Sequence, residues 1–198
     1  MLDNKHKKGM KKMQYNNAQN GIKRLFSAQI LELVGLVLVL LGLMGLTILG
    51  LVGLVFMITG LVRNVLGILE AAKDDENFRK ASIFVIAHVI LYVAGRFLGR
   101  GILGGILGLG NYVSLMLSVW YVALGISSVA SGIGNMDIAE YSKGRAKIIL
   151  ILYAVILVGT VLSVIPGIAE IATLVTSILA MVAVILYIFL LHKGQKMF

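Results

Sequence analysis

Residues Leu25–Val62 read LFSAQILELVGLVLVLLGLMGLTILGLVGLVFMITGLV, and Glu32 is their only charged side chain. A helix rises about 1.5 Å per residue, so about 20 apolar residues cross the hydrocarbon layer of a bilayer. The stretch is nearly twice that length and is rich in Gly. It predicts two transmembrane helices folded back on each other as a hairpin. One long bent helix is the alternative.

The composition of the whole chain supports a lipid environment. Hydrophobic residues make up 59% of its 198 residues and charged residues only 14%, against about a quarter in soluble domains. One Pro and long apolar runs favour helices over a transmembrane β-barrel. The lack of Cys excludes disulfides, zinc–thiolate sites and a cysteine nucleophile. The sequence therefore predicts an all-α integral membrane protein.

Apolar runs separated by polar links predict six transmembrane helices, arranged as three hairpins. Pro166-Gly167 predicts a turn between the last two, because Pro cannot continue the helical hydrogen-bond ladder. The segment 95–110 is rich in Gly and has two interpretations, a flexible loop on the membrane or a re-entrant segment lining a cavity. The predicted helices span about 25–41, 45–69, 81–98, 111–133, 148–165 and 168–191.

A basic tail, residues 1–24, precedes the first apolar run. It holds seven Lys and Arg residues against one Asp, a net charge of +6 of the chain's +9. Binding to nucleic acid is the weaker interpretation, since Tyr15 is the only aromatic residue of the tail. Attraction to anionic lipid headgroups is favoured, through Lys7, Lys8, Lys11, Lys12, Lys23 and Arg24.

The distribution of Lys and Arg also predicts an orientation. The tail, the links after the second and fourth helices, and the C-terminus hold sixteen of the eighteen basic residues. Arg96 and Arg100 lie on the opposite side. Basic flanks remain in the cytoplasm, so both termini are predicted to be cytoplasmic. Small size and the Lys-rich, Asn-containing tail favour a bacterial plasma membrane.

Sparse identities predict a three-fold internal repeat. At a shift of 65 residues Gly60 falls on Gly125, and Lys80-Ala81 falls on Arg145-Ala146. At a shift of 56 residues Lys23-Arg24 falls on Arg79-Lys80. Each hairpin would then begin on the cytoplasmic side at a Lys or Arg residue, here called a basic step: Arg24, Lys80 and Arg145.

Small and polar residues recur on one face of each predicted helix. Lipid gives associating helices no hydrophobic gain, so close backbone contact and hydrogen bonds must hold the bundle together. We therefore expect these faces to be packing seams, although a pore lined with hydroxyl groups would have a similar pattern. The last helix carries Ala180, Ala183 and Tyr187 on this face. The other predicted packing residues are Gly53, Gly60, Gly67, Ser114, Ser118 and Gly125.

Glu32, His88 and Tyr153 form a candidate buried polar site. Each follows a basic step by eight residues, which places all three about 12 Å along their helices from the cytoplasmic surface. Ionisable groups at this depth are costly unless paired or hydrated. Glu32 could pair with His88 or Tyr153 and fix helix register, or Glu32 and His88 could form a proton or cation site. Otherwise the groups remain apart, and Glu32 snorkels toward the surface or contacts a partner subunit.

The sequence contains no phosphate-binding Gly loop, no His-Glu-x-x-His, no Gly-x-Ser-x-Gly and no cluster of His, Asp and Glu at metal-ligand spacing. No cofactor, metal or catalytic residue is therefore predicted. We expect a non-catalytic subunit, scaffold or immunity-type partner of a membrane complex, or a homo-oligomer. The alternatives are a small channel or transporter for protons or small cations and, after it, an intramembrane enzyme.

Overall fold

The computed structural model describes residues 14–98 and 102–198 and contains six long helices. They are α2 (Asn16–Leu43), α3 (Thr47–Ala71), α4 (Glu76–Leu98), α5 (Ile102–Gly132), α6 (Met136–Leu162) and α7 (Ala169–Gln195). All six are long and apolar enough to cross a membrane. The prediction of an all-α chain with six such helices is confirmed.

Consecutive helices pack as antiparallel pairs, α2 with α3, α4 with α5, and α6 with α7. Residue 45 separates α2 from α3 with a φ of +107°, and Gly167 has a φ of +90° between α6 and α7. Only Gly adopts such angles without strain, which is why both chain reversals contain one. The single bent helix considered for Leu25–Val62 is therefore wrong.

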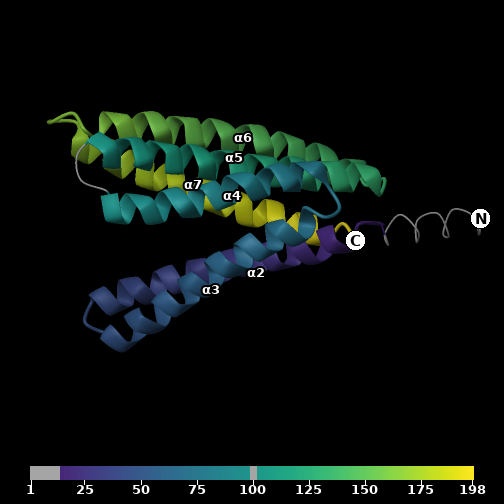
Figure 1. Ribbon diagram of the computed structural model, residues 1–198, viewed down its shortest axis with the longest axis horizontal. Helices are drawn as coiled ribbons and strands as arrows, with labels where there is room; N and C mark the ends of the chain where they lie inside the picture. The colour runs from purple at the N-terminus through teal and green to yellow at the C-terminus, as the bar shows by residue number, and fades with distance from the viewer. Residues whose placement is uncertain (1–13, 99–101) are drawn as a thin grey trace, which may run out of the picture.

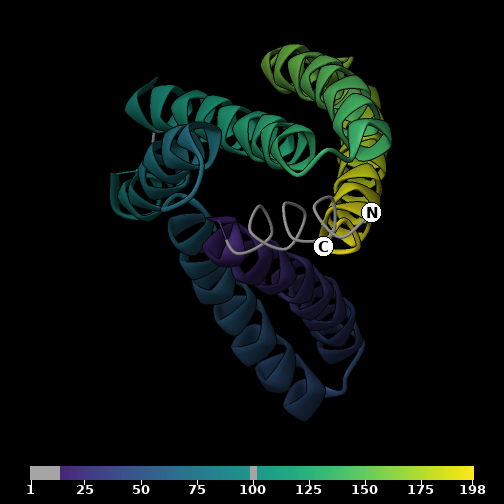
Figure 2. The same cartoon turned by 90° about the vertical axis from the view of Figure 1, so that its right-hand side faces the viewer.

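The three pairs meet at one end of the molecule, here called the base, which holds both described chain ends (Figure 1). Looking at this end, the pairs lie around a common axis (Figure 2). α3 contacts α4, α5 contacts α6 and α7 contacts α2, so the ring of helices closes. Toward the other end, here called the distal end, α2 and α3 diverge from the remaining helices (Figure 1).

The hydrophobic core is concentrated in the base. Its largest fully buried side chains include Ile22 and Leu25 of α2, Phe78 of α4, Ile126 of α5 and Leu190 of α7. Nearer the distal end, many large apolar side chains are exposed, such as Ile48 at 78% and Val164 at 80%. Lipid is the solvent that suits such a surface.

Several helices begin earlier than the apolar runs predict. α2 begins at Asn16 rather than residue 25, because Asp74 accepts hydrogen bonds from the Asn17 side chain and the Ala18 N–H, both at 2.8 Å. Part of the predicted tail is thus helical. α4 begins at Glu76 rather than residue 81, with Asp75 capping the Asn77 N–H at 2.8 Å. α6 begins at Met136 rather than residue 148, with Asn135 as its cap.

The Gly-rich segment is helical wherever the structure describes it. Gly95–Leu98 ends α4, and residues 102–110 form the first turns of α5. The flexible loop is therefore not found there, while residues 99–101 lie outside the described part. The apolar surroundings expected for this segment give backbone groups no water to bond, so intrahelical bonds outweigh the low helix propensity of Gly.

Candidate functional site

Seven glycines bring α2 and α3 into backbone contact along their whole length. A Cβ added at Gly53 would lie 2.6 Å from the Gly35 carbonyl oxygen, and one at Gly21 would lie 2.5 Å from the Gly67 oxygen. No side chain fits at such distances. We call this contact the glycine seam; its members are Gly21, Gly35, Gly42, Gly50, Gly53, Gly60 and Gly67.

The predicted packing residues of α5 face the protein interior. Ser114 and Ser118 are buried, at 8% and 3% exposed. A Cβ at Gly125 would lie 2.6 Å from the Phe78 ring of α4, so Gly125 makes room for that aromatic side chain. Gly125 therefore lies where α4 and α5 meet.

Glu32 is held in a polar cluster beside the glycine seam. Its side chain passes over Gly60, where an added Cβ would lie 2.5 Å from the Glu32 Cγ. The Gln29 Nε2 donates to Glu32 Oε2 at 3.2 Å, and the amide of Asn64 on α3 lies beside the same carboxylate. Glu32 Oε1 is buried and has no hydrogen-bond partner among the described residues.

Two phenols from the third pair, Tyr153 of α6 and Tyr187 of α7, lie within electrostatic range of this carboxylate. Tyr187 is also buried, at 5% exposed. We call Gln29, Glu32, Asn64, Tyr153 and Tyr187 the Glu32 cluster. It spans the junction between the first and third helix pairs.

His88 lies apart from this cluster in its hydrogen bonding. Its Nδ1 is 3.3 Å from the Asn111 carbonyl oxygen of α5, and its ring lies 6.5 Å from that of Tyr92. The structure therefore gives Glu32 and His88 different partners and does not pair them. Of the three residues predicted to share a site, Glu32 and Tyr153 lie within electrostatic range of each other.

Three members of the cluster were missing from the predicted site. Gln29 and Asn64 are polar residues inside apolar runs, and that signal was available in the sequence. Tyr187 was assigned only to a packing face. Its position relative to Glu32 depends on α7 lying against α2, which the order of apolar residues does not specify.

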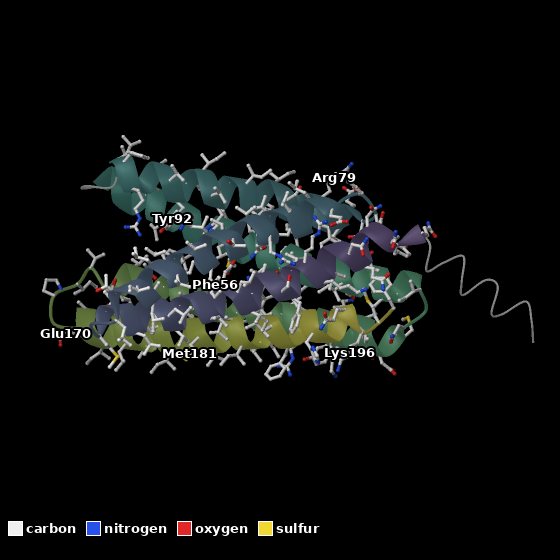
Figure 3. All side chains as sticks on the ribbon, turned by 90° about the horizontal axis from the view of Figure 1, so that it is seen from below. Phe56, Arg79, Tyr92, Glu170, Met181 and Lys196 are labelled. Atoms are coloured by element: carbon white, nitrogen blue, oxygen red, sulfur yellow. The ribbon has the colours of Figure 1, made fainter. Side chains whose placement is uncertain are left out.

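Two of the residues predicted to contact lipid headgroups, Lys23 and Arg24, belong to the part of the chain that the structure describes. Lys23 is exposed, whereas Arg24 forms an ion pair with Glu70 at 3.0 Å. Lys7, Lys8, Lys11 and Lys12 lie outside the described residues. Figure 3 shows Arg79 and Lys196 toward the base and Glu170 toward the distal end.

Neither metal-ligating side chains nor known proteins assign a function to this chain. Within residues 14–98 and 102–198, no three His, Asp or Glu side chains are grouped closely enough to hold a metal ion. No family model, curated protein or solved structure matches the chain.

Proposed function

We propose that this chain is a non-catalytic, multi-pass membrane protein that acts by association, as a subunit, scaffold or immunity-type partner of a membrane complex or as a homo-oligomer. The glycines that the fold does not use carry this proposal. A Cβ added at Gly95, Gly105 or Gly108 would meet no atom within 4 Å. Each such Gly costs a helix about 1 kcal/mol relative to Ala.

These glycines suit contact between helices of different molecules. The glycine seam includes every Gly residue of α2 and α3, and Gly45 lies in their turn. The Gly content of that pair is therefore explained by contacts within the chain. Gly105 and Gly108 instead leave α5 open near the distal end. Small residues there allow another helix to approach closely in lipid.

Replacing both glycines tests the association. We expect Gly105→Ile with Gly108→Ile to release a partner or convert an oligomer to a monomer, measured as particle mass in nanodiscs. Ile106→Leu with Leu109→Ile is the matched control, since it alters the same segment without adding bulk. A wild-type chain that is monomeric and carries no bound protein would overturn the proposal.

A channel or transporter for protons or small cations is the second candidate. The unpartnered Glu32 Oε1 favours it, because a buried carboxylate oxygen requires a proton, a cation or a water molecule as partner. Flux into liposomes between about pH 5 and pH 8 should then fall in Glu32→Gln and stay unchanged in Glu170→Gln, an exposed carboxylate. Absence of flux in the wild-type chain removes this candidate.

The orientation remains a proposal with both termini in the cytoplasm of a bacterial cell. The links 72–75 and 133–135 lie at the base with the chain ends. All of them therefore lie on the same side of the membrane in this proposal. Their basic flanks support the cytoplasmic side. Reporter fusions that place residues 72–75 outside the cell would reverse it.

The burial pattern supports the three-fold repeat and revises its register. In each of α3, α5 and α7 one buried residue is followed by other buried residues 7, 8 and 11 positions later. The α3 and α5 sets are offset by 118 − 60 = 58 residues, and the α5 and α7 sets by 183 − 118 = 65. The sets are Gly60, Gly67, Ile68 and Ala71; Ser118, Gly125, Ile126 and Val129; Ala183, Leu190, Leu191 and Gly194.

This register pairs Gly67-Ile68 with Gly125-Ile126, whereas the identities in the sequence had placed Gly60 on Gly125. The two alignments differ by seven residues, about two helical turns. The residues four positions after Gly60, Ser118 and Ala183 are Asn64, Val122 and Tyr187, respectively. Two of these three equivalent residues belong to the Glu32 cluster.

A further inference from the structure

Two cations from different helices lie against one aromatic ring at the base. The Lys193 Nζ of α7 is 4.1 Å from the centroid of the Tyr141 ring, and the Arg145 Cζ of α6 is 5.1 Å from it. Tyr141 itself packs against the hydrophobic core. The ring therefore holds both positive groups in defined positions, since a cation is attracted to the face of an aromatic ring.

Both cations lie at the depth of lipid headgroups. Arg145 shortly precedes the apolar part of α6, which begins at Ile148, and Lys193 shortly follows the apolar part of α7, which ends at Leu191. A Tyr residue between them is typical of the membrane–water interface.

An exposed apolar side chain accompanies each cation on its own helix. Ile148 lies three residues beyond Arg145 and is 44% exposed, and Phe189 lies four residues before Lys193 and is 57% exposed. Residues at these spacings share a helix face. Each positive group thus has exposed apolar surface beside it, on the side expected to face the hydrocarbon.

No Asp or Glu side chain of the described residues forms an ion pair with either cation. The ion pairs there join Arg24 to Glu70, and Arg79 and Lys80 to Glu76. Asp137 and Glu140 on α6 are exposed and pair with neither Arg145 nor Lys193. Two positive charges held at one ring repel each other, and an anion between or beside them relieves that repulsion.

We propose that Tyr141, Arg145 and Lys193 bind the phosphate of an anionic glycerophospholipid, with its acyl chains along the exposed faces of α6 and α7. The guanidinium of Arg145 supplies paired donors to phosphate oxygens, and the Lys193 ammonium supplies a mobile charge. The site is independent of the association proposed above and uses none of the glycines that carry it.

Lipid titration of the full chain, followed by native mass spectrometry, tests this site. We expect bound phosphatidylglycerol to exceed phosphatidylcholine in the wild type, and Arg145→Gln with Lys193→Gln to weaken phosphatidylglycerol binding about five-fold per cation removed. Lys143→Gln with Lys147→Gln is the matched control, because it removes the same charge from exposed positions of α6. It should retain the bound lipid.

Two further arms separate the possible sources and the role of the ring. Glycerol 3-phosphate should not displace the lipid, since it lacks acyl chains. Tyr141→Phe should bind as the wild type does, whereas Tyr141→Leu should lose affinity. The lipid site would be overturned if Arg145→Gln with Lys193→Gln and Lys143→Gln with Lys147→Gln lost the same affinity for phosphatidylglycerol. Displacement of the lipid by glycerol 3-phosphate at similar concentration would also overturn it.

Discussion

Gly53 shows at the scale of one residue why the glycine seam tolerates no side chain. A Cβ there would lie 2.6 Å from the Gly35 oxygen and 2.7 Å from the Val39 nitrogen, both of them backbone atoms. Gly53→Ala must therefore push α2 and α3 apart. We expect the free energy of unfolding in detergent to fall by about 1–3 kcal/mol, measured by denaturant titration.

Gly144→Ala is the control for this prediction. A Cβ at Gly144 would meet nothing within 4 Å, and the residue lies within α6. Because Ala restricts the unfolded chain more than Gly does, stability should stay equal or rise by about 0.4–1 kcal/mol. The same loss in both variants would contradict the seam.

Phe78 provides a second prediction at this scale. Its ring is fully buried and packs on Gly125 of α5. Phe78→Ala should lower stability by about 3–5 kcal/mol, because it removes buried surface and leaves a cavity. Phe97→Ala makes the same change at a side chain that is 83% exposed, and its thermal midpoint should barely move. Similar shifts in the two midpoints would argue against a core at Phe78.

The sequence identified Glu32 as an unusual residue but not its partners. Its charge within an apolar run was sufficient to mark it. Equal depth along three helices then made His88 and Tyr153 candidate neighbours of Glu32. Depth does not specify the direction in which a side chain points, and His88 instead lies 3.3 Å from the Asn111 carbonyl oxygen.

The start of α2 illustrates how single elements are stabilised beyond their apolar runs. Asp74 accepts two hydrogen bonds at 2.8 Å, from the Asn17 side chain and the Ala18 N–H. Asp74→Ala removes the acceptor for both, and bonds to a charged group contribute about 1.5–3 kcal/mol each. Hydrogen exchange at residues 16–24 should therefore become faster.

Glu140→Ala is the matched change for this measurement. It removes an exposed carboxylate from α6, far along the chain from α2. Exchange at residues 16–24 should then remain as in the wild type. Unchanged exchange in Asp74→Ala would show that the first turns of α2 do not depend on this cap.

Hydropathy predicted the number of helices and their order, but placed several ends too far inward. Polar flanks such as residues 136–147 look like water-exposed links, yet they bury Ala139, Ser142 and Ala146 against the base. Those contacts exist only once the other helices are in place. Sequence patterns cannot contain these contacts, and the bonds from Asn17 and Ala18 to Asp74, more than 50 residues away, have the same dependence on the fold. Asn135 differs, because it caps the Ile138 N–H three residues further along the same chain.

At the scale of the whole molecule, closure of the helix ring rests on α2 meeting α7. The rings of Phe26 and His192 lie 5.4 Å apart at this contact. The chain has no Cys, so Phe26→Cys with His192→Cys introduces the only thiols. We expect a short bifunctional thiol reagent to link them within one chain in vesicles, detected by intact mass.

A second thiol pair controls for collisions between flexible parts. Gly45→Cys with Gly167→Cys places the thiols in turns of two different pairs at the diverging distal end. This pair should link little within one chain. Equal yields from both pairs, or none from Phe26 with His192, would contradict the closed ring.

Helix count follows from length and hydropathy, but the arrangement of the pairs does not. All six helices offer similar apolar faces, and specific contacts such as Ile22 with Gly194 distinguish one neighbour from another. The spacing shared by Gly60, Ser118 and Ala183 was present in the sequence, yet it stands out only when burial is known.

The convergence of the three helix pairs at the base, with α2 and α3 leaning away at the other end (Figure 1), has a consequence for the surrounding membrane. Such a tapered body takes up unequal area in the two leaflets. The leaflet around the wider end must give up more lipid molecules, which creates a lateral stress that bending can relieve. A protein of this shape is therefore expected to sort toward curved regions of its membrane.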